Sequence, residues 1–471
     1  IKLDEKSIED KEIILEKETF SKILPEFLDK KHIRSKAFSL SLPALLNMFL
    51  ISLVGMVDMI MVGRLGPAAI SAVGMVNQPV LVIISVFMAL TVGTTALVAR
   101  FIGAKDINRA KDIARQSIVV SIFFGVILLP LLYLFAAQIE RAMGAEPQVL
   151  ALGVTYMRTI AIGTPFNVLA MGLGAILRGS GDMKTPLIAD IIANLFNIYG
   201  DYSLIFGKFG APALGVAGAG IATSIARFIS SMILLYVLYR GKTVVKLSLK
   251  ESYHLNFNTL KRIFNIGVPS ALEQLILRTG QLAFVRIVAV LGTVAFATHQ
   301  IAMNIQSLSF MPGQAFSIAA TTLVGQLLGA NKPDIAEESA NQTRLLGMMV
   351  SGISAFTIFF FGKYLTMLYT NDIAIIEQSR ICLRIIALIQ PAQSTQFILA
   401  GALRGGGDTR FPLYSTILGI WGMRVALAYL FVIIFGWGLT GAWLAIGFDQ
   451  VLRAMVIYSR FRSGKWKQLE V

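Results

Sequence analysis

Long apolar segments recur along almost the whole chain and decide the environment in which it can fold. Each is about 20 residues or longer, and a helix of that length crosses the roughly 30 Å hydrocarbon core of a bilayer. The segments are continuous and do not alternate every second residue, so they favour helices over a β-barrel. The composition agrees, because 55% of the residues are hydrophobic and only 15% are charged.

The apolar segments predict an all-α integral membrane protein with twelve membrane-spanning helices. The expected spans are residues 37–62, 72–99, 113–137, 149–177, 186–206, 214–239, 263–291, 295–328, 340–365, 376–403, 412–435 and 438–459. Residues 1–36 are dense in acids and bases and hold no long apolar run, so we expect a cytoplasmic extension. No short apolar core with a small-residue cleavage site precedes the first span, which argues against a secretory signal.

The two halves of the sequence repeat each other. GAILRGSGDMKTPL, which contains Arg178, matches AGALRGGGDTRFPL, which contains Arg404. With these arginines aligned, an offset of 226, six of the ten residues that begin with them are identical. The same offset aligns residues 97–116 with residues 323–342, with seven identities in twenty. Separated blocks that share one offset indicate an internal duplication.

The duplication sets the expected architecture. Each half has six spans, an even number, so both halves enter the membrane in the same direction and are related by an axis along the membrane normal. We predict two pseudo-symmetric six-helix bundles around a central cleft, enclosed by a single chain that acts as a monomer. The expected domains are an N-terminal extension (1–36), an N-lobe (37–239), a cytoplasmic linker (240–262), a C-lobe (263–460) and a cytoplasmic tail (461–471).

The net charge of +15 is placed in alternate loops. Basic residues are dense in 97–116, around Arg178 and Lys184, in the linker and in the tail, whereas the other loops hold one basic residue or none. The positive-inside rule therefore predicts a multi-pass protein of the cell membrane with both termini in the cytoplasm. Nucleic-acid binding would need this charge gathered on one folded face, so it is not expected.

No enzyme pattern is visible in the sequence. Cys382 is the single cysteine, and His32, His254 and His299 are scattered, so neither a disulfide framework nor a metal cluster is expected. A phosphate-binding GxxxxGK[ST] loop is also absent from the sequence, which argues against ATP hydrolysis. We predict a protein that is not an enzyme and has no cofactor.

Polar side chains inside the spans are the candidates for function, because ionisable groups are costly at membrane depth. Asn47 and Asp58 lie eleven residues apart on one face of the first helix. Spacings of four, three and four residues give the fifth helix a single polar stripe of Asp190, Asn194, Asn197 and Asp201. The C-lobe spans carry a further set: Glu273, Gln300, Asn304, Ser307, Gln390, Gln393 and Gln396.

Two carboxylates that converge among amides have a definite chemistry. Repulsion between Asp58 and Asp201 would let the pair hold one proton, and their oxygens are also ligands for a hard cation. The structural alternative is that each acid only caps or pairs within the bundle. Glu273 beside Arg278, and Asp449 four residues before Arg453, allow the same structural interpretation as ion pairs. The roles of Arg278, Arg286 and Arg424 stay open.

Several motifs resemble one known family. They are VDMIMVGRLG (57–66), the paired LRGxGDxxxP loops, NLFNIYGDYSLIFG (194–207) and VAGAGIATSIAR (216–227). Together they resemble the multidrug and toxic compound extrusion (MATE) transporters, over about residues 35–460. That family lies in a larger superfamily that also contains polysaccharide and lipid flippases.

The resemblance implies antiport, in which inward flow of H⁺ or Na⁺ drives export of small organic cations or amphiphiles. Pro43 would be the bending point of the first helix, and Glu273 would be the C-lobe acid. Some members have an Asp where this chain has Gln393, so a C-lobe sodium site is in doubt. The implied N-lobe cation site is Asp58, Asn197, Asp201 and Thr223, with Asn194 beside it. Gln300, Asn304 and Gln396 join Glu273 and Gln393 as candidates for coupling or substrate contact.

The alternative to a multidrug antiporter is a flippase for lipid-linked saccharides. Such a protein would use a cationic cavity to hold pyrophosphate, and Arg278, Arg286 and Arg424 lie inside spans. The acids of the N-lobe favour export of cations instead. A channel is disfavoured because the sequence shows no filter-like repeat, and the choice between H⁺ and Na⁺ stays open because oxygen ligands serve both.

Overall fold

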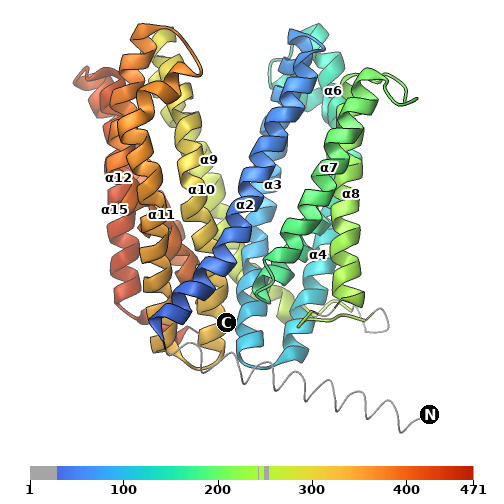
Figure 1. The fold of residues 1–471 in the computed structure, drawn as a ribbon, viewed down its shortest axis with the longest axis vertical. Helices are drawn as coiled ribbons and strands as arrows, with labels where there is room; N and C mark the ends of the chain where they lie inside the picture. The colour runs from blue at the N-terminus through green and yellow to red at the C-terminus, as the bar shows by residue number, and fades with distance from the viewer. Residues whose placement is uncertain (1–28, 242, 249–253, 470–471) are drawn as a thin grey trace.

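The computed structural model describes residues 29–241, 243–248 and 254–469, and these residues form helices joined by short connections (Figure 1). The N-lobe helices are α2 (Lys30–Gly63), α3 (Pro67–Gly103), α4 (Ile107–Leu134), α6 (Pro147–Gly179), α7 (Lys184–Phe206) and α8 (Val216–Arg240), with a short α5 (Ala136–Ala142). Of the predicted extension 1–36, residues 1–28 lie outside the described part of the chain, and α2 begins at Lys30.

The C-lobe repeats this order. Its first helices are α9 (Phe257–Ala289), α10 (Thr293–Gly329), α11 (Pro333–Met367) and α12 (Ile373–Gly405). The next span is continuous but alternates between α- and π-helix, as α13 (Arg410–Ile417), η2 (Leu418–Val425), α14 (Ala426–Tyr429) and η3 (Leu430–Ile434). It is followed by α15 (Gly438–Arg462) and a short 3₁₀ turn, η4 (Lys465–Gln468). The prediction of twelve spans in two six-helix lobes is confirmed for the residues that the structure describes.

Seven of these described spans are apolar enough, by length and composition, to cross a membrane: α2, α3, α4, α6, α8, α11 and the span from Arg410 to Ile434. The other five long helices, α7, α9, α10, α12 and α15, are more polar. Their polar side chains include the buried Asp201, Glu273, Gln393 and Asp449. Burial inside a lobe removes these groups from lipid, which is how a helix of mixed composition is accommodated at membrane depth.

The backbone confirms the duplication. α3 and α10 have bounds that differ by 226 residues at both ends. Gly181 and Gly407 of the repeated LRGxGD motif both have positive φ angles, +88° and +89°. Lys105 and Asn331, also 226 apart, share the left-handed conformation at φ values of 60° and 56°. Two segments of different sequence thus fold into the same turns.

The first helix of the N-lobe crosses between the lobes. Near its start, Ala37 and Leu40 pack against Ala319 and Leu323 of α10. Near its end, Val62 packs in the N-lobe core. Pro43, which the family resemblance makes the expected hinge proline of α2, lies between these two parts and deprives the helix of one backbone hydrogen bond.

The first helix of the C-lobe crosses in the opposite sense. Ile263 and Ile266 of α9 pack in the N-lobe core, whereas Phe284 and Val288 pack in the C-lobe core. Pro269, the repeat equivalent of Pro43, lies between them. Each lobe therefore holds the first part of the other lobe's leading helix.

The lobes are joined at the end drawn lowermost in Figure 1, and they diverge toward the upper end. This lower end carries the connections 104–106, 180–183, 330–332 and 406–409. Thr322 Oγ1 donates to the carbonyl oxygen of Arg178 at 3.0 Å, and Gln326 Nε2 donates to that of Gly179 at 3.1 Å. These bonds link α10 of the C-lobe to the last turn of α6 in the N-lobe.

Two equivalent glycines allow α3 and α10 to cross closely at the lower end. A Cβ atom added at Gly103 would collide with the carbonyl oxygen of Gln326. A Cβ added at Gly329 would collide with the carbonyl oxygen of Arg100. Gly103 and Gly329 are 226 residues apart, as are Arg100 and Gln326, so the pseudo-twofold axis passes through this crossing.

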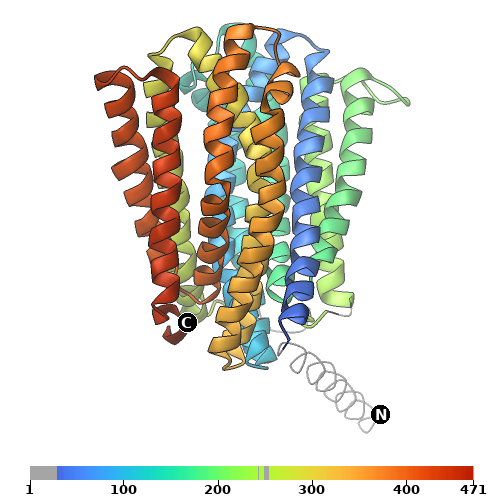
Figure 2. The same ribbon diagram turned by 60° about the vertical axis from the view of Figure 1, so that its left-hand side comes forward.

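The described part of the predicted tail is folded against the lower end, where both views place the chain's C-terminus (Figures 1 and 2). Trp466 is fully buried and stacks on Phe461, with ring centroids 5.1 Å apart. Lys467 pairs with Glu337 of α11 at 2.6 Å. Arg100 Nη2 donates to the carbonyl oxygen of Leu469 at 3.1 Å, so the tail contacts both lobes.

Candidate functional site

Asp58 of α2 and Asp201 of α7 face each other inside the N-lobe, within hydrogen-bonding reach of one another. Asp201 is buried, and Asp58 is partly buried. Asp58 Oδ1 and both carboxylate oxygens of Asp201 find no donor among the described residues. Arg227 of α8 lies close enough for its charge to act on Asp58. Facing carboxylate oxygens of this kind can share a proton or bind a hard cation.

Amide and hydroxyl groups surround the acid pair. Asn197 is buried one turn before Asp201, and its Nδ2 lies 3.5 Å from Thr223 Oγ1 of α8. Asn194 is also buried, and its Nδ2 has no acceptor among the described residues. Tyr156 of α6 lies within electrostatic range of both acids. The predicted N-lobe residues thus lie on adjacent helices, and Tyr156 is a member that the sequence patterns did not single out.

The C-lobe has an apolar core where the N-lobe has its acid pair. The repeat offset of 226 places Phe284 at the position of Asp58 and Leu427 at that of Asp201. Phe284 is buried in the C-lobe core cluster, and Leu427 packs against the same cluster. The acid pair is therefore a feature of one lobe and was not duplicated with the fold.

Glu273 of α9 is buried and bound to Arg404 of α12. Arg404 Nη2 donates to both carboxylate oxygens at 2.8 Å, and Thr416 Oγ1 donates to Oε1 at 3.2 Å. The sequence offered Arg278, five residues further along the same helix, as a structural ion-pair partner, and that assignment is wrong. The sequence does contain a signal that could have identified Arg404 as a candidate partner, because it is the repeat equivalent of Arg178 and lies in the duplicated loop.

The remaining C-lobe candidates do not form one cluster. Gln393 and Gln396 of α12 are buried, and both have side-chain atoms without partners among the described residues. Gln300 and Asn304 of α10 are exposed. The structure therefore separates this predicted group into two buried amides inside the lobe and two on its surface.

Asp449 forms a buried ion cluster with two arginines. Arg453 Nε donates to Asp449 Oδ1 at 2.7 Å, and Arg424 Nη2 lies 2.6 Å from Oδ2. All three side chains are buried between α15 and the π-helical η2. The expected pairing of Asp449 with Arg453 is confirmed, and Arg424 is held by the same carboxylate.

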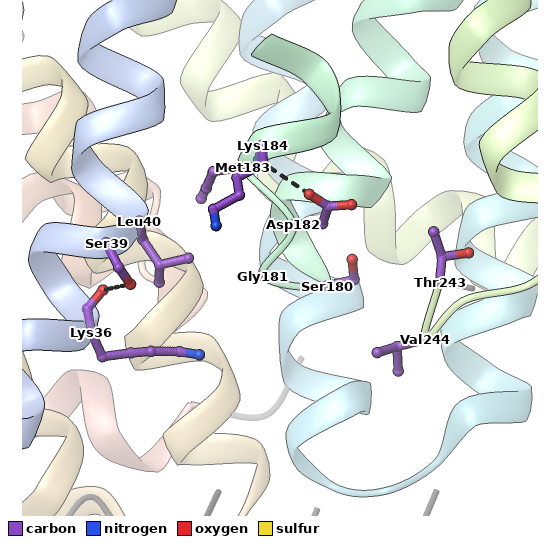
Figure 3. Close-up of a pocket in the computed structure, with 10 residues that line it drawn as sticks. All are labelled: Lys36, Ser39, Leu40, Ser180, Gly181, Asp182, Met183, Lys184, Thr243 and Val244. Carbon is purple, nitrogen blue, oxygen red and sulfur yellow. Dashed lines mark hydrogen bonds between the residues drawn. The ribbon is translucent and has the colours of Figure 1, made fainter. Parts of the chain in front are cut away.

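A surface pocket of about 400 Å³ lies at the lower end, away from these sites (Figure 3). Its walls come from the first turns of α2, the 180–183 connection and residues 243–244. Asp182 faces into it, and its carboxylate accepts from the backbone nitrogen of Lys184 at 3.1 Å and from that of Thr185. Asp182 thus caps the start of α7, which begins at Lys184, before Pro186.

A duplicated bundle of twelve long helices, with carboxylates held at membrane depth, is the architecture of a multi-pass membrane transporter. The MatE family model matches residues 43–203 and 269–430, most of both lobes. The chain belongs to this family, as its motifs predicted, and is a transporter and not an enzyme. The matched segments begin at the equivalent prolines Pro43 and Pro269.

Curated relatives match over nearly their full length. The probable multidrug resistance protein NorM of Thermotoga maritima is 34% identical over 447 residues, which cover 93% of this chain and 94% of the relative. The uncharacterized transporter YisQ of Bacillus subtilis is 30% identical, over 92% of this chain and 94% of the relative. The multidrug resistance protein MdtK of Proteus mirabilis is 29% identical, over 89% of this chain and 92% of the relative.

Solved structures share the fold. A MOP superfamily transporter from Pyrococcus furiosus, described as having a binding pocket of reverse polarity, matches with a TM-score of 0.85 and 26% identity. That match covers 92% of this chain and 96% of the other. A multidrug resistance MATE family transporter in its outward-facing conformation also matches with a TM-score of 0.85 at 26% identity, over 93% and 97%.

Proposed function

We propose that this chain is a secondary active multidrug efflux transporter. A cation, H⁺ or Na⁺, moves inward through the Asp58–Asp201 pair and drives an organic cation or amphiphile outward by alternating access. The supporting observation is the acid pair itself. Three of its four oxygens have no donor in the described part of the chain, and its repeat equivalents are apolar. The relatives named as multidrug resistance proteins support the substrate class.

Coupling follows from the energetics of the pair. Loaded with one cation, the two carboxylates tolerate a closed and dry lobe, whereas two bare charges require hydration. Cation and drug then favour different conformers, and differential affinity for two conformers is sufficient for coupling. Each lobe is complete within one chain, so we propose that the monomer is the transporting unit.

The flippase alternative draws less support from the structure. A lipid-linked pyrophosphate would need free cationic groups within the spans. Arg424, one of the three arginines considered for that role, is buried against Asp449.

Efflux from reconstituted vesicles tests the proposed function. Purified protein would be placed in vesicles loaded with a fluorescent organic cation, and pH and Na⁺ gradients would be imposed separately. Inward movement of one of these ions should accelerate efflux of the dye, and reversing that gradient should stop it. Efflux that ignores both gradients would refute ion-coupled antiport.

We further propose that the lower end faces the cytoplasm, because the connections dense in basic residues lie there. In this orientation the conformer described here, joined at the lower end, is outward-facing. A cysteine at Lys105, in the 104–106 connection, should resist a membrane-impermeant reagent added to intact cells. A cysteine at Lys208, exposed at the opposite end, should react. The reverse pattern would invert the topology.

A further inference from the structure

In each lobe a polar link joins the leading helix to the fifth helix, one turn beyond the hinge proline. In the N-lobe, Asn47 Nδ2 of α2 donates to Asp190 Oδ2 of α7 at 2.9 Å. In the C-lobe, Thr416 Oγ1 of α13 donates to Glu273 Oε1 of α9 at 3.2 Å. Asn47 is the repeat equivalent of Glu273, and Asp190 is that of Thr416. The link is thus conserved between the lobes, although the carboxylate has changed sides.

The surroundings of the two links also correspond. Arg404 binds Glu273 through two hydrogen bonds of 2.8 Å. Its repeat equivalent, Arg178, lies close enough to Asp190 for their opposite charges to attract. Ser230 Oγ of α8 donates to the other oxygen of Asp190 at 3.1 Å. Each lobe therefore keeps one carboxylate with an arginine from the duplicated loop at this level.

The cation pair lies above the N-lobe link on the same two helices. Asp58 follows Asn47 by eleven residues, and Asp201 follows Asp190 by eleven. Eleven residues are three helical turns, so the acid pair lies about 16 Å further along both helices, on the same faces. In the C-lobe this upper level is the apolar pair Phe284 and Leu427, whereas the link below it remains.

The link therefore serves a purpose that does not require a cation pair above it. The first part of α2 packs on the opposite lobe, and everything beyond its hinge proline must move with its own lobe. A half-buried hydrogen bond to a carboxylate one turn beyond the proline fixes where the second part of the helix begins. The same reasoning applies to α9 and its bond to Thr416.

We propose that Asn47 and Asp190 are positioning residues that anchor the second part of α2 to α7 and so hold Asp58 opposite Asp201. Glu273, with Thr416 and Arg404, anchors α9 in the same way. The inference rests on the proposed function for its link to transport, but the anchoring itself is a statement about helix position. Asn47 Oδ1 has no donor now, so exchanging the two side chains, with the amide at position 190 donating to the carboxylate at position 47, would leave no additional oxygen unpaired.

Exchanging the two side chains tests the anchor. At a pH where both carboxylates are ionised, Asn47→Asp alone replaces the donor with a second negative charge and breaks the link, so it should weaken the apparent affinity for the driving ion about tenfold or more. Adding Asp190→Asn restores one carboxylate and one donor, in the orientation that the C-lobe uses, and should return the affinity to within about threefold of the wild type. Asn47→Leu should be impaired like Asn47→Asp.

A matched control removes a bond to Asp190 that does not involve α2. Ser230→Ala should leave the ion affinity within about twofold of wild type. If the exchanged double variant bound the ion as weakly as Asn47→Asp, the proposal would be overturned. The exchange restores the hydrogen bond, so a failed rescue would mean that loss of this bond does not cause the defect. Asn47→Asp and Asn47→Leu variants with wild-type affinity would also overturn the proposal.

A distance measurement separates this proposal from the proposed function. The buried Cys382 is first replaced by Ala. Spin labels are then attached to cysteines at Arg64, which follows α2, and at Lys208, which follows α7. The distance between the labels reports the relative position of the two helix ends. Asn47→Asp should shift or broaden this distance, and the exchange should restore it. Unchanged distances would refute the anchor, whereas a wild type without ion-driven efflux would refute only the antiport.

Discussion

Asp58→Asn should reduce ion-driven efflux to the level of protein-free vesicles while leaving the protein folded in the membrane. Asn has nearly the same shape, so packing in the N-lobe changes little. It neither accepts a proton near neutral pH nor offers a negative charge to Na⁺, so the cation has no site to occupy. Replacing one of two facing carboxylates also removes their repulsion, so the melting temperature should be unchanged or higher.

Asp201→Asn should give the same loss, and the double variant should be no worse than either single one. Such non-additivity is expected of two groups that form one site. Glu146→Gln is a suitable control, because Glu146 is exposed and makes no side-chain capping bond. The measurement is gradient-driven efflux, with thermal unfolding followed in parallel. Substantial coupled efflux by Asp58→Asn would return this acid to a structural role.

Most of the fold was predictable because its determinants are local or periodic. Apolar runs of membrane length predicted all twelve spans, and the described helices extend some of them at the ends, as with α2, which begins at Lys30. The offset of 226 predicted the equivalence of the lobes, including the paired turns at Gly181 and Gly407. The crossing of α2 and α9 was not predictable, because it depends on which lobe each end contacts.

In the candidate sites, too, features set by helical periodicity were predictable, whereas contacts between distant parts of the chain were not. The spacing of eleven residues placed the polar positions on one face of α2 and on one face of α7. The resemblance to the family implied that Asp58 and Asp201 share a site, and the structure brings them together. The partner of Glu273 lies 131 residues away, so proximity in sequence suggested Arg278 instead. Helical periodicity identifies which residues share a face, but it does not say which helix covers that face.

Gly103→Ala should shift the protein away from the conformer in which the lobes meet at the lower end. An added methyl group would collide with the backbone of α10 at Gln326, and backbone atoms yield less readily than a flexible side chain. Overpacking of this kind costs about 1–3 kcal/mol, so the population ratio should change by roughly five- to 150-fold. Gly329→Ala, at the equivalent side of the crossing, should act in the same direction.

The shift can be measured as a distance between spin labels at Lys208 and Asn371, exposed positions at the upper ends of the two lobes. Closing the upper end should shorten this distance in both variants. Gly74→Ala is the matched control on α3, because an added Cβ at Gly74 meets no atom within 4 Å. The collision exists only where α3 and α10 cross, so a conformer in which the lower end has opened should tolerate the methyl group. Unchanged distances in Gly103→Ala and Gly329→Ala would show that this crossing does not separate the two states.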